Sequence, residues 1–117
     1  RAAAIRYERA LAGLPSPHAA VVARLAATLV DASAPDEALT AIAESGLEDV
    51  ESALVARERG RALAASGRSR EAIEPLLAAV RSNPYDADTH EELEKAYLAI
   101  GDEVRAEREH RLTMLWR

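Results

Sequence analysis

The chain has 117 residues, of which 49% are apolar and 30% charged. This length and balance are typical of a single globular domain with its own core, and they exclude general disorder. The formal net charge of −5 and an aromatic content of 3% argue against a nucleic-acid surface or an anionic membrane as the partner. Because there is no cysteine, disulfides, thiolate metal sites and a cysteine nucleophile are excluded.

The predicted secondary structure is entirely helical. Alanine dominates the sequence, followed by leucine, arginine and glutamate, and all four are strong helix formers. No segment alternates between apolar and polar residues as a strand does. About seven helices are expected, the first of them within residues 1–18, where two prolines mark its end.

The best-defined pair of helices lies in residues 48–82. The first is expected over 48–66 and stops at Gly67, since glycine adopts the left-handed cap conformation without a Cβ clash. Ser69 is expected to be the N-cap of the second, which ends before Pro84. Pro75 lies inside that helix and predicts a kink there.

Another pair of helices follows in residues 87–117. Asp86 or Asp88 is expected to cap the first of them, and Gly101 to end it. Asp102 is expected to cap the second.

The sequence repeats with a period of 34 residues, which is typical of stacked helix hairpins. Residues 53–86 and 87–117 are the clearest copies, and 19–52 is a weaker one in which Ser33 stands where the others have a turn glycine. Residues 1–18 match the second helix of a preceding copy, so the chain is expected to begin in mid-repeat as a piece of a longer array. Matching residues lie 34 apart: Ala38, Ala72 and Ala106; Leu29, Leu63 and Tyr97; Ala26 and Gly60; Gly67 and Gly101.

This pattern resembles the tetratricopeptide repeat (TPR), over essentially the whole chain. The resemblance implies an all-α right-handed superhelix of stacked antiparallel hairpins, in which small residues sit where helices cross. Gly60 facing Ala72 would let the two helices of one hairpin touch. The residues that match the family's packing pattern are Ala38, Gly60, Leu63, Gly67, Ala72, Ala79, Pro84, Leu93, Tyr97, Gly101 and Ala106.

The resemblance also implies a binding surface, because the first helices of TPR repeats line a concave groove that takes a peptide or a partner helix. The cations Arg57, Arg61 and Lys95 favour an acidic segment there. The Asn, Lys and Arg set with which some family members hold a C-terminal carboxylate is missing. Aligned groove positions are Ala23, Ala27 and Val30 in the first copy, Leu54, Arg57, Arg61 and Ala64 in the second, and Asp88, Glu91, Lys95 and Leu98 in the third.

No catalytic or metal-binding set emerges from the sequence, and no cofactor is expected. A phosphate-binding glycine loop and a nucleophile-elbow serine are both missing. Glu107 and His110 have the spacing of a di-metal motif, but only one such motif is present, so His110 is interpreted as a packing residue. His90 is likewise interpreted as a packing residue, and His18 as a loop or first-turn residue.

The sequence therefore predicts a protein-interaction scaffold or adaptor, not an enzyme. Two alternatives stay open: a regulatory or dimerisation module of a bacterial transcriptional activator, and an accessory region of a larger enzyme. The partner is a protein, with an acidic peptide segment as one candidate; direct binding of nucleic acid or membrane is not expected. Self-association is also considered, since the chain ends in apolar residues from Leu112 to Trp116. The compartment is left open, with the cytoplasm slightly favoured.

Overall fold

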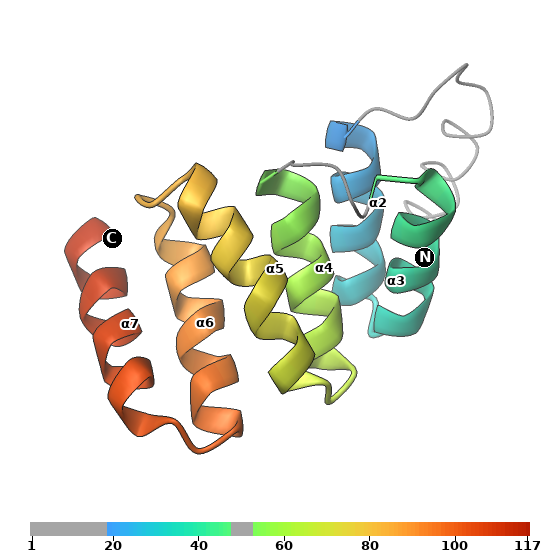
Figure 1. The fold of residues 1–117 in the computed structure, drawn as a ribbon. Coiled ribbons are helices and arrows are strands. Elements are labelled where there is room, and N and C mark those ends of the chain that lie inside the picture. The colour runs from blue at the N-terminus through green and yellow to red at the C-terminus, as the bar shows by residue number, and fades with distance from the viewer. Residues whose placement is uncertain (1–18, 48–52) are drawn as a thin grey trace.

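The computed structural model describes residues 19–47 and 53–117, which form six helices and no strand (Figure 1). The helix predicted within 1–18, and the first five residues of the one predicted over 48–66, lie outside the described residues. The helices are α2 (Ala19–Asp31), α3 (Pro35–Ser45), α4 (Ala53–Ala65), α5 (Ser69–Ser82), α6 (Ala87–Ala99) and α7 (Glu103–Trp116).

Consecutive helices pair into three hairpins that stack along one direction (Figure 1). The pairs are α2 with α3, α4 with α5, and α6 with α7. The first helix of the middle hairpin, α4, contacts both α2 and α6. The three first helices therefore lie next to one another, as the repeat resemblance predicts.

The turns inside the three hairpins share one geometry. Gly67 and Gly101 have positive φ angles of 81° and 83° and end α4 and α6, as predicted. Ser33 occupies the matching position of the first hairpin and adopts the same left-handed conformation, with φ 61°. After each turn residue, a backbone N–H donates to a carbonyl five residues back: Ala34 to Leu29 at 2.8 Å, Arg68 to Leu63 at 2.8 Å, and Asp102 to Tyr97 at 2.9 Å.

The helix starts agree with the sequence at two of three predicted caps. The carboxylates of Asp86 and Asp102 accept from backbone N–H groups at the starts of α6 and α7. The prediction of Ser69 as an N-cap is wrong: Arg68 holds the cap position, with no side-chain cap bond, and Ser69 is already helical. The reason is the turn, which closes through the Arg68 N–H and so starts the helix one residue earlier.

The core consists of two apolar clusters that meet at α4. The first joins α2, α3 and part of α4, and the second joins α5, α6 and α7 to Leu63 of α4. Gly60 lies in contact with α5, where an added Cβ would be 2.5 Å from Leu76 Cγ. Glycine thus permits the close crossing of α4 and α5. Pro75 is buried within α5, which continues on both sides of it.

Candidate protein-interaction face

The aligned groove positions lie on the three adjacent first helices, and we call this surface the first-helix face. Its most exposed apolar side chains are Leu54, at 50%, and Leu98, at 54%. Ala23 is buried, whereas Ala27, Val30 and Ala64 are half-buried between the charged residues and the core. The face therefore offers isolated apolar contacts at two places on a largely charged surface.

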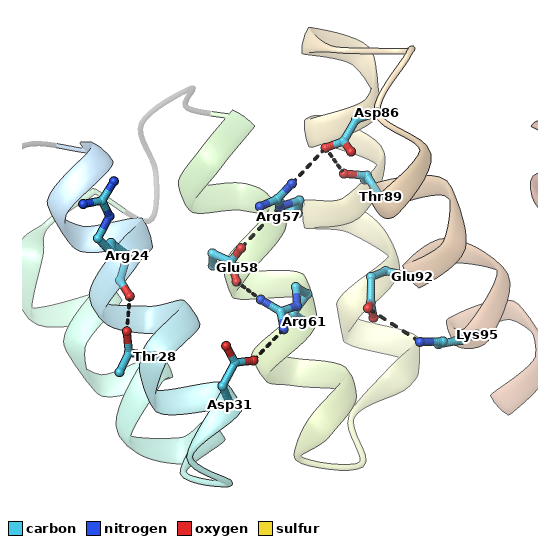
Figure 2. A network of polar contacts seen from close by, with 10 residues as sticks. All are labelled: Arg24, Thr28, Asp31, Arg57, Glu58, Arg61, Asp86, Thr89, Glu92 and Lys95. Carbon is cyan, nitrogen blue, oxygen red and sulfur yellow. Dashed lines mark hydrogen bonds and ion pairs between the residues drawn. The ribbon is translucent and has the colours of Figure 1, made fainter. Parts of the chain in front are cut away.

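An ionic network occupies the middle of this face, centred on the carboxylate of Glu58 (Figure 2). Glu58 is only 2% exposed although it is an acid. It accepts from Arg57 Nε at 3.3 Å and from an Arg61 Nη1 that lies still closer. A carboxylate removed from water in this way needs such partners, because an unpaired buried charge is strongly destabilising.

Each arginine also reaches a neighbouring hairpin (Figure 2). Arg61 Nη2 lies 3.1 Å from Asp31 at the end of α2. Arg57 Nη1 lies 3.2 Å from Asp86, the N-cap of α6, whose carboxylate also accepts from the Thr89 hydroxyl at 2.7 Å. The network from Asp31 to Asp86 therefore links all three hairpins across the face.

The electrostatics of the network favour the charged forms of Arg57, Arg61 and Asp86. Burial alone would lower the pKa of Arg57 and of Arg61, but the neighbouring carboxylates, Glu58 first among them, outweigh it and raise both. Burial would raise the pKa of Asp86, but hydrogen bonds from Thr89 and Arg57 lower it. Both arginines are thus paired with carboxyl groups of the chain itself.

The part of the face on α6 is also paired internally. Arg117 Nη2 lies 2.9 Å from both Asp88 and Glu91. Lys95 Nζ lies 3.8 Å from Glu92, and its side chain is 63% exposed. The charged groups that the sequence assigned to a partner are therefore each already paired with another side chain of this protein, most of them at solvent-accessible positions where pairing is weak.

Sequence reasoning did not assign the residues that pair with the groove positions, among them Asp31, Glu58, Asp86 and Arg117. Glu58 carried one local signal, because it precedes Arg61 by three residues and so shares a helix face with it. Asp31 and Arg61 are 30 residues apart, and Arg117 and Asp88 are 29 apart. The stacking of one hairpin on the next brings Asp31 to Arg61, whereas the antiparallel pairing of α6 with α7 inside the last hairpin brings Arg117 to Asp88.

The histidines differ from one another in environment. His90 is 2% exposed, in agreement with its interpretation as a packing residue. The same interpretation of His110 is wrong: its side chain is 56% exposed and lies 3.1 Å from Glu94. The reason is that α7 has no further helix packed on that side in the described structure. His18 lies outside the described residues.

Within 19–47 and 53–117, no group of three or more His, Asp or Glu side chains is arranged to hold a metal ion. Over the same residues, no helix combines the length and apolar character that crossing a membrane requires.

Comparison with known proteins gives structural neighbours and no sequence relatives. No family model matches the chain, and no curated protein matches it. A solved structure described as the crystal structure of MamA superposes with a TM-score of 0.83 at 23% identity, covering 98% of this chain and 67% of that one. A second, described as MamA MSR-1 C2, gives a TM-score of 0.75 at 22% identity, covering 97% of this chain and 64% of that one.

These neighbours establish the fold alone, since both are below 25% identical. The chain has an all-α, TPR-like fold of stacked helix hairpins, as the sequence predicted. It spans about two thirds of the length of the two MamA chains.

Proposed function

We propose that this chain is a protein-interaction scaffold or adaptor, in which the first-helix face binds a segment of a partner protein. The observation that carries the proposal is the arrangement of α2, α4 and α6 side by side, with Leu54 and Leu98 exposed on them. A rigid stack presents these two apolar side chains to a partner at little ordering cost.

The ionic network supports an acidic partner segment in one specific way. Asp31 is 71% exposed, so its pair with Arg61 is in exchange with solvent and contributes little to stability. A carboxylate of the partner can take the place of Asp31 and gain a bidentate contact with the guanidinium. Glu58 keeps Arg61 in position for this exchange.

A photocrosslinking experiment tests the proposed face. A photoreactive amino acid is placed at position 54 or 98, and the matched control carries it at Val104, which is 81% exposed on α7. Crosslinks to one partner from 54 and 98 but not from 104 support the face. Crosslinks from 104 alone would place binding elsewhere and contradict the proposal.

The charge of the partner is tested with Asp31→Asn. Freeing Arg61 should strengthen binding of an acidic segment several-fold, since the internal competitor is removed. Weaker binding of the crosslinked partner to this variant would instead indicate a basic segment and would refute the acidic one.

A second candidate is a dimerisation module, favoured by Met114 and Leu115, each 66% exposed at the end of α7. Sedimentation of the parent and of a Met114→Asp/Leu115→Asp variant tests it. A concentration-dependent dimer that the variant abolishes would support this reading, and a parent that stays monomeric would contradict it.

A further inference from the structure

Among the residues that the structure describes, the most buried ionisable pair outside the first-helix face joins the two helices of the last hairpin. His90 of α6 and Glu109 of α7 each have a side chain only 3% exposed, and His90 Nδ1 lies 2.6 Å from Glu109 Oε2. The other ring nitrogen, Nε2, lies 2.7 Å from the backbone oxygen of Pro84. Both nitrogens of the ring are therefore in hydrogen-bond contact with oxygens.

The hydrogen-bonding capacity of these groups fixes the number of protons. The Pro84 carbonyl can only accept, so Nε2 carries a proton, and a neutral imidazole has only one. An unprotonated Nδ1 would then place its lone pair against a lone pair of an ionised carboxylate, which is repulsive, and burial leaves neither atom a water molecule to bond instead. An imidazolium removes this conflict, because both of its nitrogens donate.

We propose that His90 is an imidazolium at neutral pH and that its proton holds α7 against α6, so that proton loss at alkaline pH loosens the last hairpin. Imidazole is a stronger base than a carboxylate, which places the shared proton on His90. Arg108 Nη2 lies 3.6 Å from Glu109 Oε1 and adds a positive charge beside this carboxyl group.

The other charged groups around the pair do not supply a substitute for this proton. On α6, burial first and the Glu109 charge second raise the pKa of Tyr97, so it stays neutral in the same pH range. On the turn before α6, Asp86 is directed to Arg57 and Thr89. Arg108 lies on α7 itself and is 59% exposed.

The size of the effect follows from proton linkage. An imidazole in an unfolded chain loses its proton at about pH 6.5, so above this pH the folded hairpin holds about one proton more than the unfolded chain. The equilibrium constant for unfolding should then rise by up to about tenfold for each pH unit, until the folded pair itself gives up the proton. The stabilisation is thus complete at mildly acidic pH and is lost as the pH rises.

The end of α7 carries a local reporter of this hairpin. Trp116 is the single tryptophan of the chain, and its ring lies 4.6 Å from that of Tyr85, on the turn between α5 and α6, in an edge-to-face contact at 78°. Movement of α7 away from α6 would separate the two rings. The fluorescence of Trp116 should therefore change with the same pH dependence as the stability.

Urea unfolding between pH 6 and pH 9 tests the proposal in three proteins: the parent, Glu109→Gln, and Glu107→Gln as a matched control on the exposed side of α7. The parent and the control should both lose stability above about pH 6.5. Glu109→Gln should show a much flatter profile, because the amide NH₂ can donate to Nδ1 of a neutral imidazole.

Side-chain ¹⁵N NMR of the parent gives an answer that does not depend on the variant folding. Both ring nitrogens of His90 should carry protons at pH 7. A bare Nδ1 on His90 at pH 7, or equal pH profiles of parent and Glu109→Gln, would overturn the proposal. Neither result bears on binding at the first-helix face, so the two proposals fail separately.

Discussion

The crossing of α4 and α5 makes a definite prediction for Gly60→Ala. Alanine is normally favoured over glycine inside a helix by about 1 kcal/mol. At Gly60, however, the new Cβ would be 2.5 Å from Leu76 Cγ and 2.6 Å from its Cδ2, about 1 Å closer than carbon atoms pack. The Ala72 carbonyl oxygen, at 3.3 Å, is a further tight neighbour.

The balance of these two effects sets the magnitude. Leu76 is fully buried, so it cannot swing into solvent to make room. Overpacking of this kind costs about 1–3 kcal/mol, and the large overlap favours the upper half of that range. After subtraction of the helix-propensity gain, Gly60→Ala should destabilise the protein by about 1–2 kcal/mol, or about 4–8 °C in Tm.

A double-mutant cycle with Leu76→Ala separates the two effects. Leu76→Ala removes Cγ and both Cδ atoms, so in that background Gly60→Ala should become stabilising by up to about 1 kcal/mol. Urea unfolding of the four proteins, with circular dichroism to confirm helicity, measures the cycle. If Gly60→Ala stabilises the parent as much as it stabilises the Leu76→Ala protein, the close-approach argument is refuted.

Three further predictions follow from the turns and the ionic network. Ser33→Gly should raise the free energy of unfolding, measured with urea, by about 1 kcal/mol because Ser33 has a positive φ. Gly67→Ser should lower it by a similar amount, and no change in either variant would contradict the shared turn geometry. Arg61→Ala should lower the free energy of unfolding by about 2–3 kcal/mol, because it removes one of the two cations that contact buried Glu58. Glu58→Gln should lower it less, and equal losses in the two variants would contradict this explanation. The folded-state pKa of Asp86 is lowered, so its carboxylate stabilises the fold above about pH 4, and this stabilisation is lost as the pH falls through the folded pKa. Asp86→Asn should therefore flatten the acid side of a plot of unfolding free energy against pH, and an unchanged acid side would exclude this role.

Most of the fold could be predicted from the sequence, because the residues that define the helices and turns act locally and recur with a fixed period. The 34-residue period located the hairpins, and glycine at 67 and 101 located two of the turns by backbone physics alone. The misplaced cap at Ser69 shows the limit of that reading. Serine is a preferred N-cap residue, so the sequence favours Ser69 beside the turn. The cap position, however, depends on how the turn closes, and here it falls one residue earlier, at Arg68.

Much less of the first-helix face could be predicted from the sequence. Alignment located Arg57 and Arg61 on first helices, yet it gave no information on whether their donors are free. Their partners Asp31 and Asp86 come from the neighbouring hairpins, about 30 residues away in sequence. Surface charges of this kind carry no periodic signal, so their pairing depends on the rotation between successive hairpins.

The division of the core into two clusters has a consequence for how the chain opens. Within 19–47 and 53–117, each helix contacts only helices near it in sequence, an arrangement of low contact order that favours fast, local folding. Val55 and Ala62 of α4 belong to one cluster and Leu63 to the other, so neither half can separate without exposing this helix. Amide hydrogen exchange should therefore be slowest in α4 and faster toward both α2 and α7, a gradient along the stack instead of one cooperative unit.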